Sequence, residues 1–160
     1  MFQSKNILVP TDFSEDSEQA LRIALCIAVK DHSRIFLLHV ISRMVHYYVS
    51  HYCHDQNIVE RIVNESILVS NERLQGIIDR CPECPNIKVI PNLRKGEPHE
   101  EILKEATERR IDLIIIAPHG ESGLRKDGIG RVAGMVLQEA RCPVLLIQGK
   151  EKKEVSACTS

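Results

Sequence analysis

Tryptophan is absent from the sequence, and aromatic residues make up only 4% of it. Few side chains are therefore available to stack on single-stranded nucleic-acid bases, and the core must be aliphatic. Charge of one sign is also lacking, because 21 Lys and Arg residues stand against 22 Asp and Glu residues. A formal net charge of -1 argues against the basic surface of a nucleic-acid-binding protein.

Long apolar runs and a secretory leader are missing as well. No uninterrupted apolar run approaches the roughly 20 residues that a membrane-spanning helix needs. The N-terminal residues do not show the charged, apolar and small-residue regions of a signal peptide. Six cysteines in 160 residues are too few for a disulfide scaffold. We therefore expect a cytoplasmic protein with reduced thiols and with neither membrane nor nucleic acid as a partner.

The residues that are present suit one compact domain. Hydrophobic residues make up 43% of the chain, enough for a core at this length. We expect a single domain over residues 1–148, followed by a polar C-terminal tail over residues 149–160.

Short apolar runs alternate with stretches of helical periodicity. Such unbroken runs are typical of strands that are covered on both faces. The predicted strands are residues 6–10, 35–40, 87–90, 113–116 and 144–147. The predicted helices begin after Ser14, run from about Ile58 to Ile78, begin at Pro98, and run from about Val132 to Ala140. This alternation predicts an α/β protein with an open parallel sheet and helices on both faces.

In an open parallel sheet, ligands bind beyond the carboxyl ends of the strands, where the strand order reverses. Three segments that follow predicted strands should meet there: residues 10–12, 39–40 and 117–120. The segment 119–132 is the most informative, because several glycines precede a helix and allow close approach of the backbone to an anion. Its cations, Arg125, Lys126 and Arg131, favour a phosphate site over an ordinary glycine-rich loop. It is not a Walker A loop, because Gly-x-x-x-x-Gly-Lys-Ser/Thr is absent.

Several motifs together give the chain a family resemblance. They are residues 7–14 (Ile-Leu-Val-Pro-Thr-Asp-Phe-Ser), 38–40 (Leu-His-Val), 96–98 (Gly-Glu-Pro), 112–116 (Asp-Leu-Ile-Ile-Ile), 119–120 (His-Gly) and 142–145 (Cys-Pro-Val-Leu). From Asn6 to about Gln148 the chain resembles the universal stress protein family. The resemblance implies an adenine nucleotide alpha hydrolase-like fold with strand order 3-2-1-4-5. It also implies a homodimer through the apolar edge of the fifth strand, and bound ATP or AMP, with or without Mg²⁺.

The resemblance further implies a set of nucleotide-binding residues. Asp12 would lie beside the ribose or base, and Val40 would offer backbone groups to adenine. His119 and Gly120 would border the ribose and phosphates. The complete set is Pro10, Thr11, Asp12, Val40, Ala117, His119, Gly120, Gly130, Arg131 and Val132. From the residues alone, the favoured interpretations are that Asp12 is a turn residue before the first helix and that His119 is an ordinary loop histidine.

The chain departs from the motif of the family's nucleotide-binding branch, which is Gly-x-x-Gly, nine residues, then Gly-Ser/Thr. Ala117 replaces the first glycine, and Arg131 replaces the hydroxyl residue. Pro118 removes one backbone N–H from the turn. Arg131 either pairs with a phosphate or fills the phosphate site and pairs with Asp12 or Asp127.

Two functions follow from these observations. The first is a stress-response or regulatory protein that binds an adenine nucleotide and has at most slow ATP hydrolysis, because no nucleophile with a base and no paired carboxylates are evident. The second is a family member that binds no nucleotide and acts as a protein-interaction module. An adenylating enzyme is disfavoured, because residues 10–14 do not form a Ser-Gly-Gly-x-Asp-Ser-type loop.

Cysteine and histidine clusters suggest further chemistry. Residues 81–84 (Cys-Pro-Glu-Cys) have the CxxC spacing of redox motifs and zinc half-sites, but they follow a helix and precede a strand, unlike a thioredoxin motif. His51, Cys53 and His54 form a weak candidate metal set. A helix of roughly 30 Å separates the two clusters, so they should not share a metal within one subunit.

The other residues of this kind have simpler interpretations. We expect residues 42–56 to be irregular. Their tyrosines would pack over the crevice as a lid or join a dimer contact; they are Tyr47, Tyr48 and Tyr52. Cys26 and Cys142 are expected in the core, and Cys158 in the tail.

Overall fold

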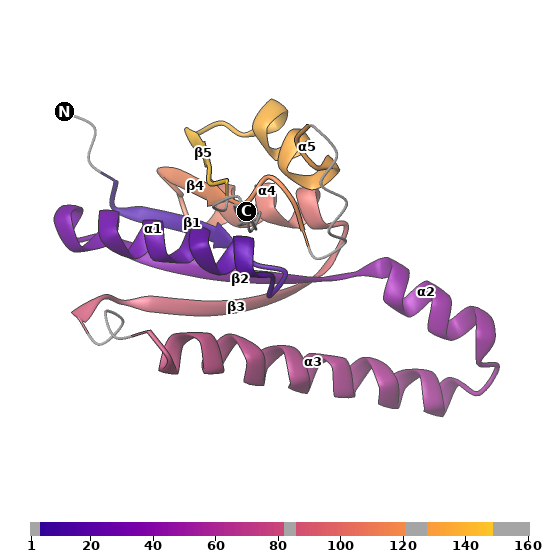
Figure 1. The fold of residues 1–160 in the computed structure, drawn as a ribbon. Helices are drawn as coiled ribbons and strands as arrows, with labels where there is room; N and C mark the ends of the chain where they lie inside the picture. Colours follow the sequence, from indigo (N-terminus) through magenta and orange to yellow (C-terminus); the bar gives the residue numbers. More distant parts are fainter. Residues whose placement is uncertain (1–3, 82–85, 121–127, 149–160) are drawn as a thin grey trace, which may run out of the picture.

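The fold is a five-stranded parallel sheet in the order β3-β2-β1-β4-β5 (Figure 1). A computed structural model of the chain describes residues 4–81, 86–120 and 128–148. Its elements are β1 (Asn6–Pro10), α1 (Glu15–Asp31), β2 (Arg34–Ser42), α2 (Arg43–Tyr52), α3 (Gln56–Asp79), β3 (Val89–Gly96), α4 (Pro98–Glu108), β4 (Leu113–Ile116), α5 (Arg131–Glu139) and β5 (Val144–Leu146). The predicted fold class and strand order are confirmed. The expected tail over 149–160 lies outside the described residues.

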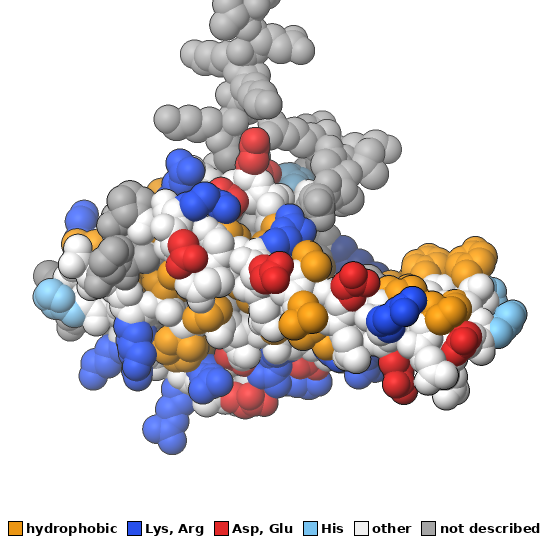
Figure 2. Space-filling view, turned by 90° about the horizontal axis from the view of Figure 1, so that it is seen from below, with side chains coloured by type: hydrophobic (Ala, Val, Ile, Leu, Met, Phe, Trp, Pro, Cys, Tyr) orange, Lys and Arg blue, Asp and Glu red, His pale blue; other side chains and the backbone are white. Residues whose placement is uncertain are grey.

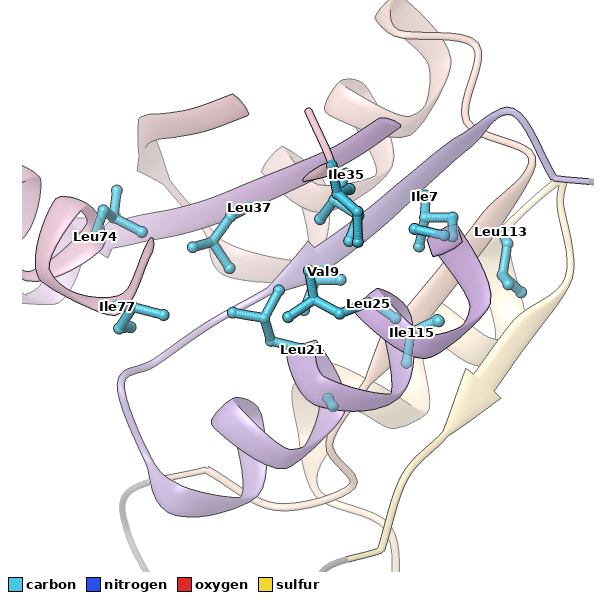
Figure 3. Packing of buried hydrophobic residues seen from close by; sticks show 14 residues of the cluster. Ile7, Val9, Leu21, Leu25, Ile35, Leu37, Leu74, Ile77, Leu113 and Ile115 are labelled. Carbon is cyan, nitrogen blue, oxygen red and sulfur yellow. The ribbon is translucent and has the colours of Figure 1, made fainter. Parts of the chain in front are cut away.

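The central strand β1 is buried on both faces. Its side chains alternate, so Ile7 and Val9 face one layer of helices and Leu8 faces the other. On the first face α1 and α3 cover the sheet, as Figure 3 shows for Leu21 and Leu74. On the second face α4 and α5 supply the contacts, which come from Ile102, Ala133 and Val136. The core is aliphatic on both faces, apart from Phe36 on the second.

Local signals explain where the first helix begins and which way it faces. Ser14 is the N-cap of α1, and its side chain accepts a hydrogen bond from the N–H of Ser17 at 3.2 Å. The buried residues of the helix recur at helical spacing: Ser17, Ala20, Leu21, Ala24, Leu25 and Ala28. Cys26 lies off this stripe and is exposed, so its predicted place in the core is wrong. Cys142 is only half-buried, and that burial raises the pKa of its thiol.

Two predicted elements differ from the structure. β3 runs from Val89 to Gly96, beyond the predicted 87–90. The second half of β3 contains polar residues, so it does not show the apolar run that predicted the other strands. An edge strand is covered less fully than a central one and can carry such residues. Residues 42–56 are not irregular, since Arg43–Tyr52 form α2 with Ser42 as the N-cap. Its apolar residues Met44, Tyr48 and Tyr52 recur every four residues. The helix lies beyond the sheet together with the start of α3 (Figure 1).

A buried charge network fastens β3 to α4. Arg94 donates to Glu101 at 2.9 Å, to Glu105 at 2.6 Å and to Glu108 at 2.9 Å. The Glu105 side chain is fully buried, and that of Arg94 is 18% exposed. These carboxylates raise the pKa of Arg94 above its ordinary value. Lys104 and Arg94 hold the pKa of the Glu101 carboxyl below its ordinary value, against the opposing effect of burial.

We predict that Arg94→Met strongly destabilises the fold at pH 7. The substitution removes the closest cation of the buried Glu105 and leaves it only the more distant Arg109, at 3.3 Å. Removing one partner of a buried charge network typically costs about 3–5 kcal/mol. The matched control is Lys104→Met, because the Lys104 side chain is 51% exposed and its removal leaves Glu101 paired with Arg94 at 2.9 Å, so a smaller loss of stability is expected. Urea unfolding measures both changes, and equal losses would contradict the interpretation.

The same network has a testable pH dependence. A carboxyl whose pKa is lowered on folding stabilises the fold above its unfolded pKa, and this contribution is lost as the pH falls through the lowered value. The wild type should therefore lose the contribution of Glu101 under acid, below the ordinary glutamate pKa. In Arg94→Met the glutamates have lost part of their positive charge, and they become neutral on acidification, so the difference in stability from wild type should narrow. A gap that stays constant between pH 7 and pH 4 would contradict this.

Candidate functional site

A cavity of about 320 Å³ opens at the carboxyl ends of the central strands. It lies between the loops after β1 and β4, the end of β2, and the starts of α4 and α5. The cavity is lined by Pro10, Thr11, Asp12, Leu38, His39, Val40, Pro98, Ile102, Ile116, Ala117, Pro118, His119, Gly120, Gly130, Arg131, Val132 and Ala133.

Chain topology places the cavity here. After β1 the chain turns to the face covered by α1, and after β4 it reaches α5 on the opposite face. A crevice therefore opens between these neighbouring strands, as expected at a reversal of strand order. The structure brings together every residue of the predicted nucleotide set around this one cavity.

The loop after β1 is held by its own side chains. The Thr11 hydroxyl accepts a hydrogen bond from the N–H of Phe13 at 3.0 Å and lies 3.0 Å from the Ser17 hydroxyl. Asp12 Oδ1 accepts from the N–H of Ser14 at 3.1 Å and from its hydroxyl at 2.5 Å. Asp12 is thus a turn residue at the start of α1 and also a wall of the cavity.

A stack of rings and one cation supports the cavity from the side of α3. His39 Nδ1 lies 2.8 Å from the carbonyl oxygen of Thr11, and since a carbonyl only accepts, Nδ1 carries a proton. The Phe13 and His39 rings lie 4.3 Å apart between centroids. The guanidinium of Arg73 also contacts the Phe13 ring and lies 4.1 Å from its centroid. Phe13 has a left-handed backbone with φ 68°, which is uncommon for a bulky residue and typical of constrained sites.

Two glycines allow the cavity walls to approach closely. A Cβ on Gly120 would lie 2.6 Å from Asp12 Oδ2, and a Cβ on Gly130 would lie 2.7 Å from the carbonyl oxygen of Pro118. The N–H of Gly130 donates to that same oxygen at 2.7 Å. The contact ties the start of α5 to the loop after β4, so a larger residue at either position would push the walls apart.

The start of α5 lies at the end of the cavity that could hold an anion. Gly130 is its N-cap and offers no side-chain capping group. The first N–H groups of a helix lack partners within the helix and carry partial positive charge, which favours an anion. Val132 and Ala133 in this first turn line the cavity. The remaining loop cations, Arg125 and Lys126, lie outside the described residues.

Arg131 stands at the rim of the cavity. Its side chain is 79% exposed, and Nη2 lies 3.7 Å from Glu97 Oε1. The ion-pair partner that the structure shows is therefore Glu97, not the predicted Asp12, while Asp127 lies outside the described residues. Because the Arg131 side chain is so exposed, it does not fill the end of the cavity at the start of α5. The cavity therefore remains open.

Sequence reasoning missed several residues that line the cavity. They are Pro98 and Ile102 from α4 and Leu38 from β2. The position of residues 96–98 after the third predicted strand was an available signal, because every strand of a parallel sheet ends at this edge. His39 lines the cavity, as expected for the segment 39–40.

The remaining clusters lie away from the cavity. Among the residues that the structure describes, no group of three or more His, Cys, Asp or Glu side chains could hold a metal ion, and His51, Cys53 and His54 are described. Cys84 lies outside the described residues, so the CxxC pair has no structural account. Tyr47, Tyr48 and Tyr52 belong to α2 and do not line the cavity, so their predicted role as a lid is wrong. No helix in the described part of the chain is long and apolar enough to cross a membrane.

Comparison with known proteins gives a consistent result. The sequence pattern of the universal stress protein family matches residues 3–148. Universal stress protein MJ0577 of Methanocaldococcus jannaschii is 30% identical over 155 residues, which cover 91% of this chain and 96% of that protein. Universal stress protein YxiE of Bacillus subtilis is 28% identical, covering 89% of this chain and 97% of that protein.

Solved structures agree with the sequence comparison. The structure of MJ0577 superposes with a TM-score of 0.79 at 29% identity, covering 93% of this chain and 99% of that one. Universal stress protein UspA from Lactobacillus plantarum superposes with a TM-score of 0.68 at 21% identity, covering 92% of this chain and 99% of that one. Because the identity to UspA is only 21%, this second similarity is evidence for the fold alone.

We predict that Gly130→Ala disturbs the cavity and lowers stability. The added Cβ meets backbone rather than a flexible side chain, so the loop must shift, at a cost of about 1–3 kcal/mol. Gly134→Ala on the same helix is the control, because its Cβ would lie 4.0 Å from Ile129 and alanine favours a helix by up to about 1 kcal/mol. Urea unfolding compares the two, and a Gly130→Ala protein as stable as wild type would contradict the close contact.

Proposed function

The chain belongs to the universal stress protein family, and on that basis we propose that its cavity binds an adenine nucleotide, ATP or AMP. The protein would act as a homodimeric stress-response or regulatory protein without strong catalytic activity. The observation that carries the proposal is a single cavity with an apolar interior at one end and helix N–H groups at the other.

The apolar part suits a base. Leu38, Ile102 and Ile116 are buried and line the cavity, and Val40 at the end of β2 would present backbone groups to adenine. Asp12 would accept hydrogen bonds from the ribose or base. A volume of about 320 Å³ lies at the lower end of the roughly 300–1,000 Å³ of small-molecule sites.

The opposite end suits phosphate. Gly120 and Gly130 keep the walls close enough for backbone contacts, and the first turn of α5 supplies partial positive charge. Arg131 would add a full charge from the rim, where the usual family member has a small hydroxyl residue. Ala117 is buried in the wall, so the methyl group that it adds to the family motif narrows the cavity without closing it.

Related structures support a nucleotide as the ligand. One universal stress protein was solved in complex with cAMP, and one from Archaeoglobus fulgidus in complex with dAMP. They are 17% and 20% identical to this chain, so their likeness concerns the fold, and the ligand proposal rests on the cavity residues. Relatives of this fold nevertheless hold the class of molecule that this cavity suits.

The chemistry around the cavity favours binding over turnover. Asp12 is the only carboxylate among the described lining residues, and it already accepts two hydrogen bonds from Ser14. Thr11 is the only lining hydroxyl among them, and it is engaged with Phe13 and Ser17. No lining side chain in this set is a nucleophile paired with a base, so at most slow ATP hydrolysis is expected.

A second candidate function is a protein-interaction module that binds no nucleotide. Ala117 and Arg131 favour it at the cavity. An exposed aromatic surface on α2 also favours it, and Figure 2 shows hydrophobic side chains gathered at this projecting end. Tyr47 is 58% exposed, Tyr48 53% and Tyr52 81%. Contiguous exposed apolar side chains often mark contact sites.

The homodimer is proposed to form through β5. This strand ends the sheet and pairs only with β4 among the described strands. Its exposed side chain is Leu145, at 38% exposure. The other edge, β3, carries Pro91 and Lys95, which discourage further pairing. The open apolar edge is therefore the better site for a two-fold contact.

Equilibrium binding of labelled ATP and AMP to the purified, dialysed protein tests the proposed ligand. We predict saturable binding below millimolar nucleotide, and a loss of about tenfold or more in Arg131→Ala, because a charge-assisted hydrogen bond is worth about 1.5–3 kcal/mol. Arg141→Ala is the matched control, since Arg141 is an exposed arginine that does not line the cavity. Its affinity should equal that of wild type.

The outcomes separate the two functions. No detectable binding up to millimolar nucleotide would overturn the ligand proposal. If Arg131→Ser then created ATP binding, the interaction module would be favoured, because only the family's hydroxyl residue had been missing. If Arg131→Ser weakened binding already present in wild type, the interaction alternative would fail.

Sedimentation equilibrium tests the dimer. Leu145→Lys places a charge on the β5 edge and should convert a dimer to a monomer, because the charge would be buried without a partner. Val29→Lys is the control, since Val29 is 54% exposed and lies on helix α1 rather than on a sheet edge. A wild type that is monomeric, or a Leu145→Lys protein that remains dimeric, would contradict the proposed interface.

A further inference from the structure

His99 has an unusual environment at the start of α4. Its side chain is 9% exposed, and its Nδ1 atom is buried without a hydrogen-bond partner. The acidic atom closest to it is Glu97 Oε1, at 3.6 Å. This separation is beyond the roughly 2.7–3.2 Å of a hydrogen bond. Buried polar atoms are normally paired, so an unpaired one calls for a functional explanation.

Glu97 stands between this histidine and the rim of the cavity. It occupies the N-cap position of α4, yet its side chain makes no capping hydrogen bond. The same oxygen, Oε1, lies 3.6 Å from His99 Nδ1 and 3.7 Å from Arg131 Nη2. One carboxylate is therefore shared between two groups and is within hydrogen-bond distance of neither.

The other charged groups near α4 are engaged elsewhere or lie outside this cluster. α4 packs against α5, β2 and β3. Their charged or titratable residues, with those of α4, are Arg131, Glu139, Arg34, His39, Arg94, Lys95, Glu100, Glu101, Lys104, Glu105 and Glu108.

Most of these groups have partners that the structure shows. Arg94 binds the buried glutamates of α4, and Lys104 binds Glu101. His39 bonds to the Thr11 carbonyl, and Arg34 bonds to Asn6 at the opposite end of β2. Glu139 ends α5, opposite its Arg131 end. Lys95 and Glu100 are exposed. Glu97 is therefore the charge that acts directly on His99, and Arg131 acts on it through Glu97.

We propose that anion binding in the cavity is coupled to uptake of a proton by His99. The inference rests on the proposed function. A phosphate at the start of α5 draws the Arg131 guanidinium toward itself and away from Glu97. The Glu97 carboxylate then closes on His99 Nδ1 and, having lost its cation, favours the imidazolium, which carries a proton on both ring nitrogens, over a neutral tautomer with one. The proton comes from solvent, and the imidazolium replaces the arginine as the counter-charge of Glu97.

The direction of the pH dependence follows from linkage. The bound state holds the His99 proton more tightly than the free state, so lowering the pH strengthens nucleotide binding. One linked proton changes affinity by at most about tenfold per pH unit. Histidine is the side chain suited to such coupling near neutral pH. His99 and Glu97 thereby regulate the site without contacting the nucleotide.

Calorimetric titration with AMP between pH 6 and pH 8 tests the coupling. The phosphate of the nucleotide itself titrates near pH 6, so the informative quantity is the difference between wild type and His99→Gln at each pH. We expect similar affinities at pH 8 and an advantage of about three- to tenfold for wild type at pH 6. Repeating the titration in buffers with different ionisation heats should show extra proton uptake of up to one per site in wild type, absent from His99→Gln.

Two further variants keep the test decisive. Glu97→Gln removes the charge that holds the proton from a partly exposed position, so it should fold and lose the same pH advantage, even if His99→Gln proves unstable. His54→Gln is the matched histidine control and should behave like wild type, since His54 is exposed and does not line the cavity. Binding with the same pH slope in wild type, His99→Gln and Glu97→Gln would overturn the inference alone. Absence of binding in every protein at every pH would overturn the proposed function and this inference with it.

Discussion

β1 is paired with parallel strands on both sides and is buried on both faces, and the rest of the molecule is arranged around it. After β1 the chain enters the helical layer that contains α1, and after the neighbouring strand β4 it enters the opposite layer, which contains α5. The backbone must therefore separate at the carboxyl ends of these two strands. A cavity at this point is a consequence of connectivity rather than of any particular side chain. The aliphatic core keeps the strands in register. That register places the loop after β1 opposite the loop after β4.

The site is built largely from backbone and from small residues. Gly120 and Gly130 allow loop-to-loop distances that a Cβ would prevent. Side chains act mainly as supports: Asp12 and Thr11 stabilise the loop after β1, and Phe13 and His39 stack beneath it. A site of this kind tolerates changes at its rim. The exchange of a hydroxyl residue for Arg131 is compatible with an open cavity, because that side chain lies in solvent beside Glu97.

Sequence reasoning predicted the fold well where one face or one cap dominates the local pattern. The buried strands 6–10 and 113–116 and the Ser14 cap were predicted at their observed positions. It failed where tertiary contacts replace local pattern. Edge strand β3 extends through polar residues because β2 pairs with it along its whole length. The first helix, α1, turns Cys26 to solvent although its sequence neighbours are apolar. Helix α2 is a different case, because its apolar residues Met44, Tyr48 and Tyr52 recur at helical spacing and the local signal was overlooked.

The sequence by itself determined the fold class, the family, and which loops meet at the carboxyl edge of the sheet. Periodicity and glycine placement are local properties that can be read directly along the chain. Only the tertiary structure decided that Arg131 faces Glu97, that the Nδ1 of His99 is buried without a partner, and that Arg94 gathers the glutamates of α4. Such pairings join residues from different elements. Their distances depend on how helices and strands pack in three dimensions, and no spacing along the chain encodes that packing.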